Sequence, residues 1–449
     1  KDGDNNNNNN DKQSTKLQAT YESYAVGGAA GILGAGNYDF PADILTELFI
    51  KGRTAVYKPN PVVQKSAPVL QHIFAPLIER GFLKFVIGGA AVGSALVQQS
   101  VLDEIVLTGS VHTFEKIQPL AGSTPICAEL GAVNPWIIVP GPKWNKGSIN
   151  AHARALAFAK LVNNGHVCAA PQAILVAKDW KWRSAFMERL RYWLAQHPGS
   201  PAFYPGSDES HAHFAQLDGA EQVVPEQQKQ QAKRGGPEAP LQRRPSLFGQ
   251  KSQHSIILFT DLDGSSPSAK EGAKLPRNSN LEVLTREAFC PVLAEVALDY
   301  SESQDPVEFL RKAVHYAETK LFGSLTATLL MDDKTARRPE VDQIIADMKF
   351  GVVGVNVYPT FCYSLPQMIW GAFPGQTESG EGFLGNCGMY DNVEKGVLRA
   401  PFFWIGRRLL SVEPSAARSQ KVFRRMAQYK MKPNLLNQTK LFSALFLGV

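Results

Sequence analysis

The stretch FVIGGAAVGSALVQQSVLDEIVLTGS, residues 85–110, decides the fold predicted for this chain. A short apolar run at 85–87 precedes a glycine turn, a helical pattern covers 92–99, and a second apolar run at 104–108 leads into Gly-Ser. A strand, a helix and a second strand at this spacing form the repeating unit of a parallel sheet. The stretch therefore predicts an α/β fold.

The same alternation continues toward the N-terminus. The upstream elements are a glycine-rich strand candidate from Tyr24, a helical pattern at 43–50, a short strand at 54–58 and a helical pattern at 67–80. Parallel sheets covered by helices bind ligands at the carboxyl ends of their strands, where Lys58 and the Thr108-Gly-Ser110 turn stand. We therefore expect a nucleotide crevice at this edge. Residues 88–93 match a dinucleotide fingerprint only loosely, and tight packing explains their glycines better.

A cysteine and a carboxylate stand at separate glycine turns. Cys168 follows Asn164-Gly-His-Val and precedes a strand-like run at 173–177, while Glu129 begins Glu-Leu-Gly-Ala. A thiol at a polar turn can be deprotonated, and a nearby carboxylate can act as a general base. Together they form a pair suited to covalent catalysis. Considered alone, Cys168 has a buried structural role as its alternative.

Seven short segments, in order between about Tyr24 and Pro401, resemble motifs of the aldehyde dehydrogenase superfamily. They are Lys58-Pro-Asn-Pro61, Leu107-Thr-Gly-Ser110, Glu129-Leu-Gly-Ala132, Asn164-Gly-His-Val-Cys168, Arg286-Glu-Ala-Phe-Cys-Pro-Val292, Gly354-Val-Asn356 and Trp370-Gly-Ala-Phe-Pro-Gly375. The resemblance implies a parallel-sheet nucleotide-binding domain joined to an α/β catalytic domain. It also implies oxidation of an aldehyde to a carboxylic acid with NAD or NADP.

The resemblance assigns expected roles to particular residues. Cys168 would attack the aldehyde, and the backbone N–H of Cys168 and the side chain of Asn37 would stabilise the resulting oxyanion by hydrogen bonds. Glu129 would activate the water that hydrolyses the thioester. The remaining expected roles concern the cofactor: Thr108, Gly109 and Ser110 would meet the pyrophosphate, Lys58 the adenosine ribose, and Glu287 and Phe289 the nicotinamide ribose. No metal site is expected.

Several positions depart from the family pattern. The Asn37 motif has two extra residues before its proline, Phe114 replaces a glycine, and His166 stands ahead of the cysteine where glutamine is usual. Pro61 stands where many relatives carry a ribose-binding glutamate, which predicts weaker discrimination against NADP. The family also has on the order of a hundred more residues before the equivalent of Asn37, so a truncated chain or a trimmed domain is expected.

Composition predicts the following organisation: a disordered asparagine-rich segment at 1–20, a partial cofactor domain at 21–129, a catalytic domain at 130–375 with a polar surface insertion at 207–253, and a C-terminal segment at 376–449. The C-terminal segment is basic. After residue 400 there are nine Lys or Arg residues and one acidic residue, Glu413, so this part of the chain carries a net charge of +8. Because the whole chain carries +6, the rest carries about −2. Such a tail is most often a solvated extension, and peripheral contact with an anionic membrane is its alternative. Binding to nucleic acid is not expected.

Five scattered cysteines without metal-type spacing favour reduced thiols and a reducing compartment, the cytoplasm or an organelle matrix. No targeting signal or membrane-spanning run is visible. A small-molecule aldehyde and a homo-oligomeric assembly are the expected partners. Two other functions remain open: a reductase of acyl thioesters or acyl phosphates on the same fold, and a catalytically inactive homologue that serves as a scaffold or assembly subunit.

Overall fold

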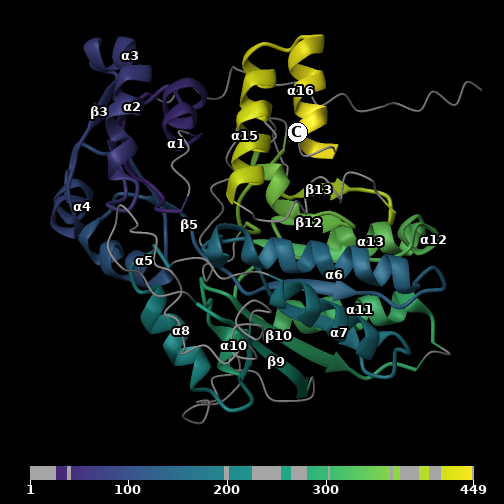
Figure 1. Ribbon diagram of the computed structural model, residues 1–449. Coiled ribbons are helices and arrows are strands. Elements are labelled where there is room, and N and C mark those ends of the chain that lie inside the picture. Colours follow the sequence, from purple (N-terminus) through teal and green to yellow (C-terminus); the bar gives the residue numbers. More distant parts are fainter. Residues whose placement is uncertain are drawn as a thin grey trace, which may run out of the picture.

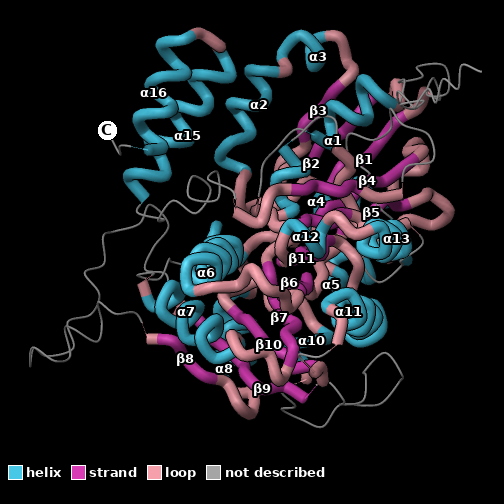
Figure 2. The backbone as a smooth tube through the Cα atoms, turned by 90° about the vertical axis from the view of Figure 1, so that its right-hand side faces the viewer, coloured by secondary structure: helices cyan, strands magenta, loops and turns pink. Residues whose placement is uncertain are grey.

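The computed structural model describes residues 27–37, 42–196, 202–224, 254–263, 281–301, 304–364, 368–374, 394–403 and 416–446. Figure 1 shows two α/β units and a C-terminal helical hairpin, and Figure 2 shows the two sheets from the side. The expected fold class is confirmed.

The first sheet has five parallel strands in the order β3-β2-β1-β4-β5. They are β1 (Ala29–Leu33), β2 (Thr54–Lys58), β3 (Leu83–Phe85), β4 (Glu104–Thr108) and β5 (Ile126–Glu129). Because neighbouring side chains in a strand point to opposite faces, Ile105 and Leu107 join one apolar cluster while Val106 joins another. Chain order reverses between β1 and β4, which is where open α/β sheets bind ligands.

The helices of this unit are short. They are α1 (Ala42–Leu45), η1 (Thr46–Ile50), η2 (Gln64–Ser66), α2 (Ala67–Ile73), α3 (Ala75–Glu79), α4 (Ala90–Val97), α5 (Val111–Ile117) and η3 (Gln118–Leu120). The single helix expected over 67–80 is wrong, because the chain leaves helical geometry at Phe74. Pro76 follows in the first turn of α3, and proline is tolerated there but not inside a longer helix.

The second sheet has eight strands in the order β13-β12-β11-β6-β7-β10-β9-β8, parallel except for β8 against β9. They are β6 (Asn134–Ile138), β7 (Pro171–Ala177), β8 (Glu221–Val223), β9 (Ile256–Asp263), β10 (Val292–Leu298), β11 (Thr326–Leu330), β12 (Val352–Val355) and β13 (Gly396–Arg399). The central strands β6 and β7 are buried along their whole length, as expected for a sheet covered on both faces.

Helices cover this sheet on both sides. They are α6 (Lys146–Leu161), η4 (Val162–Gly165), α7 (Arg183–Ala195), α8 (Ser207–Ala215), α10 (Glu282–Thr285), α11 (Pro306–Lys320), α12 (Asp333–Ala336), α13 (Pro339–Asp347) and η6 (Pro359–Ser364). The chain ends in the hairpin of α15 (Ala416–Met431) and α16 (Leu435–Phe446). Within the described ranges, no helix combines the length and apolarity needed to cross a bilayer.

Two predicted segment boundaries need correction. Residues 207–224, placed in a polar insertion, instead form α8 and the edge strand β8, and Phe214 of α8 is fully buried. Three apolar side chains, Phe214, Leu217 and Val223, join the main apolar core and anchor a segment whose average composition is polar. Residues 225–253 lie outside the described residues, as do 1–26. The second sheet also continues past residue 375, because β13 pairs with β12.

Candidate active site

A cavity of about 800 Å³ opens where the ends of β1 and β4 face the second sheet. Every residue predicted for the site lines it except Lys58. The lining includes Asn37, Thr108, Gly109, Ser110, Glu129, Cys168, Glu287 and Phe289. Lys58 ends β2 and is buried, with its side chain packed along Gly93, where an added Cβ would lie 3.5 Å from its Cε. The fold therefore brings together segments that are up to 250 residues apart in the sequence.

A left-handed turn delivers Cys168 to this cavity. Asn163, Asn164 and Gly165 have φ values of 54°, 55° and 75° in succession, which ends α6 and reverses the chain. Asparagine and glycine tolerate this conformation better than other residues. Gly165 is also required by space, since an added Cβ would lie 2.8 Å from the carbonyl carbon of Cys290.

The buried side chain of Asn134 holds the cysteine loop. Its Nδ2 donates to the carbonyl oxygens of Cys168 (2.7 Å) and Ala170 (3.1 Å), as well as to that of Ala132 (3.1 Å). Its Oδ1 accepts from the backbone N–H and the hydroxyl of Thr326 at 3.1 and 2.9 Å. Sequence reasoning missed this residue, because its partners are up to 192 positions away.

Cys168 and Glu129 are in direct contact. The thiol of Cys168 donates to Oε1 of Glu129 over 3.6 Å, and the indole N–H of Trp370 donates to the same oxygen over 2.8 Å. Burial raises the pKa of Glu129 to about 7, while the Trp370 bond acts in the opposite direction and the nearby carboxyl of Asp43 adds to the rise. Glu129 is therefore poised to exchange a proton near neutral pH.

The Cys168 thiol is neutral at rest. Burial raises its pKa well above the usual value, and the carboxylates of Glu129 and Glu287 raise it further. The N–H of Ala169, hydrogen-bonded to the sulfur, acts in the opposite direction. Formation of the thiolate therefore requires a neighbouring base that accepts the thiol proton.

Asn37 lies against the turn that leads to Cys168. Its carbonyl oxygen accepts from Nδ2 of Asn163 at 3.3 Å, and the residue lines the cavity. After the neighbouring strand β4, Ser110 caps α5 by accepting from the N–H of Thr113 at 3.2 Å.

Two buried ionisable side chains, Glu287 in the cavity lining and Lys160 in α6, influence each other's charge. Burial raises the pKa of Glu287 to about 8, opposed by Lys160 and by the N–H of Ala132. Burial also lowers the pKa of Lys160 to about 8, opposed by Cys290 and Glu287. Gly131 makes room for Glu287, because an added Cβ would fall within 1.7 Å of its Oε2. Lys160 was not predicted from sequence, since a lysine within a helical pattern is usually exposed.

His166, the departure two residues before the cysteine, is not among the residues that line the cavity. It is fully buried, its Nδ1 lies 2.7 Å from the carbonyl oxygen of Phe289, and its ring stacks on the Phe289 ring. Its Nε2 lies 3.5 Å from Oγ of Ser207, which in turn lies 3.4 Å from Nδ1 of His254. His166 thus ties the cysteine loop to the segment that carries Phe289.

Among the residues that the structure describes, no group of three or more His, Cys, Asp or Glu side chains could hold a metal ion.

Two α/β units, with Cys168 and Glu129 in the lining of a cavity at the strand ends, form the arrangement that the sequence resemblance implies. The model of the "Aldehyde dehydrogenase family" matches residues 19–248, and the chain belongs to this family.

Curated relatives match over a limited stretch. Beta-apo-4'-carotenal oxygenase from Neurospora crassa is 30% identical over 154 residues, 33% of this chain and 28% of the relative. The dimeric NADP-preferring aldehyde dehydrogenase of Canis lupus familiaris is 26% identical over 39% of this chain and 38% of the relative. The matched segments thus span well under half of these relatives.

Solved structures match more of the chain. The NAD-dependent aldehyde dehydrogenase from Sinorhizobium meliloti superposes with a TM-score of 0.56 at 18% identity, covering 81% of this chain and 65% of that one. A lactaldehyde dehydrogenase gives 0.57 at 20% identity, covering 81% and 69%. At this identity the similarity establishes the fold.

Proposed function

We propose that this protein oxidises an aldehyde to a carboxylic acid with NAD or NADP, through a thiohemiacetal and a thioester on Cys168. The observation that carries the proposal is the 3.6 Å contact between the Cys168 thiol and Glu129 in the wall of the cavity. Family membership supports the same chemistry. A nucleophile beside a general base is the arrangement that covalent catalysis on a carbonyl needs.

The residues present fit a nicotinamide cofactor. Oε1 of Glu287 is buried without a hydrogen-bond partner, which leaves an acceptor for a ribose hydroxyl. Thr108, Gly109 and Ser110 line the same cavity at the end of β4, where a pyrophosphate would lie in this type of sheet. Lys58, at the end of β2, would reach the adenosine ribose. When bound, the cofactor supplies the acceptor for the hydride that leaves the substrate carbon.

Acylation begins with a proton transfer. As the sulfur of Cys168 attacks the carbonyl carbon, Glu129 accepts the thiol proton across their existing contact. A concerted transfer avoids a free thiolate, which the raised pKa of Cys168 makes costly. The charge then develops on the substrate oxygen, where the N–H of Cys168 and the side chain of Asn37 would stabilise it.

Deacylation uses the same carboxyl group. Once hydride has left, Glu129 passes its proton to solvent and, as carboxylate, takes a proton from the water that attacks the thioester. A carboxyl with a pKa of about 7 can both accept and release protons at neutral pH. This second role is what a reductase of acyl thioesters or acyl phosphates would not need.

The test is an aldehyde panel. Purified protein is mixed with NAD or NADP and with short apolar, long apolar and charged aldehydes, and reduced cofactor is followed by absorbance. Wild-type turnover that is absent in Cys168→Ser supports the proposal. Oxidation of reduced cofactor with an acyl thioester or acyl phosphate, without aldehyde oxidation, would replace it with the reductase. Inactivity of the wild-type protein in both directions would favour a scaffold role.

A further inference from the structure

The C-terminal hairpin of α15 and α16 combines two surface properties that the catalytic function does not use. Between Ala416 and Phe446 the sequence has four lysines, three arginines and no acidic residue. Large apolar side chains are exposed on the same hairpin: Met431 at 74%, Leu435 at 78%, Leu436 at 62% and Phe442 at 57%. We propose that this hairpin docks the protein onto an anionic lipid membrane surface.

The hairpin is preformed. Val422 of α15 and Ala444 of α16 are buried, and the two helices pack against each other. Nδ2 of Asn437 donates to the carbonyl oxygens of Gln428 and Lys432 at 3.3 and 3.0 Å, and Oδ1 of Asn434 accepts from the N–H of Asn437 at 2.9 Å. A surface that is ordered in advance binds without the entropic cost of folding.

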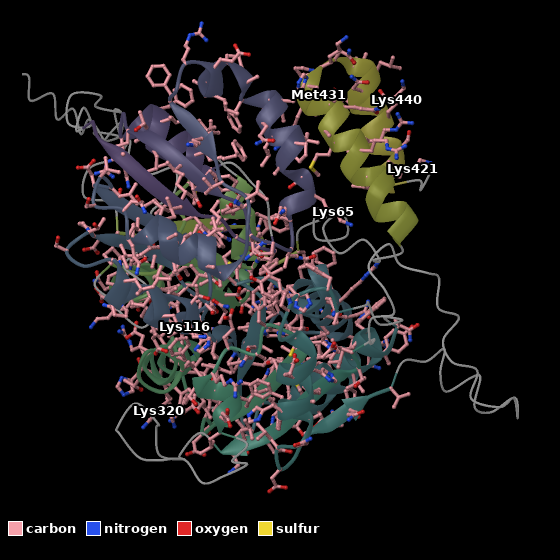
Figure 3. All side chains as sticks on the ribbon, turned by 90° about the vertical axis from the view of Figure 1, so that its left-hand side faces the viewer. Lys65, Lys116, Lys320, Lys421, Met431 and Lys440 are labelled. Atoms are coloured by element: carbon pink, nitrogen blue, oxygen red, sulfur yellow. The ribbon has the colours of Figure 1, made fainter. Side chains whose placement is uncertain are left out.

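The hairpin also has access to a large flat partner. It projects from the body of the protein in Figures 1 and 3, and Figure 3 places Met431, Lys421 and Lys440 on it, well away from Lys116 and Lys320. Lys430, Met431, Lys432, Leu435 and Leu436 are all exposed around the turn between the helices. Cations and apolar side chains thus share the projecting end.

Charge and apolar exposure together select lipid among anionic partners. Nucleic acid would attract the lysines and arginines, but phosphates and sugars offer nothing to Met431, Leu435 and Leu436. An anionic bilayer offers headgroup charge to the cations and an acyl boundary to the apolar residues. Since the helices are too short and too polar to span a bilayer, contact would be peripheral.

The experiment is co-sedimentation of the intact protein with phosphatidylcholine vesicles, with and without phosphatidylserine. We expect binding only to the phosphatidylserine vesicles, weakened by salt. Lys430→Glu with Lys432→Glu, the two exposed lysines at the turn, should reduce the partition coefficient at least about tenfold. Lys116→Glu with Lys320→Glu makes the same change in net charge on other faces and should leave binding within about twofold, since screening confines the effect to charges near the membrane. Lys430→Gln with Lys432→Gln is the milder variant if charge reversal unfolds the hairpin.

A second variant tests the apolar part. Met431→Ser with Leu435→Ser and Leu436→Ser should weaken binding while its salt dependence remains. The proposal is overturned if the wild-type protein does not bind phosphatidylserine vesicles at low salt. It is overturned as well if both charge-reversal pairs lower vesicle binding equally. It is also overturned if the protein binds a DNA or RNA duplex but no vesicle, or if the serine variant abolishes only self-association measured by ultracentrifugation. Aldehyde oxidation is measured in parallel, so an inactive protein that still binds vesicles separates the two proposals.

Discussion

Trp370 donates its indole N–H to the same oxygen of Glu129 that faces the sulfur of Cys168, at 2.8 Å against 3.6 Å. The indole therefore holds the carboxyl group in place and favours its ionised form. The two residues are 241 positions apart in the sequence, and neither local pattern indicates that they meet.

Replacing Trp370 with phenylalanine should shift the pH dependence of turnover. The indole bond lowers the pKa of Glu129, which burial has raised to about 7, so its loss raises that pKa further. Because catalysis needs the carboxylate, the rise in kcat with pH should move to higher pH. Trp193→Phe is the matched control, since Trp193 also donates its Nε1 to a side chain, Asn150, but far from the cavity. An unchanged pH profile in Trp370→Phe would contradict this account.

Replacing Cys168 with serine should lower turnover at least about a thousandfold without loss of folding. Cys127→Ser is the control, because Cys127 is also partly buried but lies outside the cavity lining. Stopped-flow measurement of reduced cofactor and circular dichroism together check this prediction. Wild-type rates in Cys168→Ser would show that the sulfur is not the nucleophile.

The variant Glu129→Gln separates the two proposed steps of the base. If Glu129 only activates water, a pre-steady-state burst of reduced cofactor survives while later turnovers slow about a hundredfold or more. The direct contact with the thiol leads us to expect that the burst slows as well. Alkylation by iodoacetamide gives an independent readout, and it should slow in the same variant. A full-rate burst would confine Glu129 to deacylation.

Removing the Asn134 side chain should destabilise the protein and loosen the cysteine loop together. Asn134→Ala leaves three carbonyl oxygens and the Thr326 donors without this partner, so the free energy of unfolding should fall by about 3 kcal/mol. Asn150→Ala, which loses one bond to Trp193, should cost about 1 kcal/mol. Urea unfolding measures both. Equal costs in the two variants would show that Asn134 is not central to the loop.

Cofactor preference should respond to position 61. Pro61 follows β2 and is exposed, and it offers no carboxylate to repel a 2′-phosphate. We expect NADP to bind at least comparably to NAD, and Pro61→Glu to shift preference toward NAD. Titration of each cofactor decides this. The prediction is wrong if the wild-type protein binds NAD more than about tenfold more tightly than NADP, a difference of roughly 1.4 kcal/mol.

The sequence by itself determined the α/β class and eight of the residues that line the cavity. Alternating strand and helix patterns predict a parallel sheet, and glycine turns at strand ends mark where polar groups gather, because both signals depend on neighbouring residues. Glu129, Cys168 and Thr108-Gly-Ser110 were identifiable for this reason. The segment bounds predicted from average composition were less accurate, since the buried side chain of Phe214 anchors α8.

Only the tertiary structure decided how these residues are supported. The hydrogen bonds from Trp370 to Glu129 and from Asn134 to the Cys168 loop join residues more than thirty positions apart, and so does the electrostatic influence of Lys160 on Glu287. The environment that raises the pKa of Glu129 is likewise a property of burial, which arises when the two sheets pack together. Such contacts depend on chain topology and leave no periodic signal in the sequence.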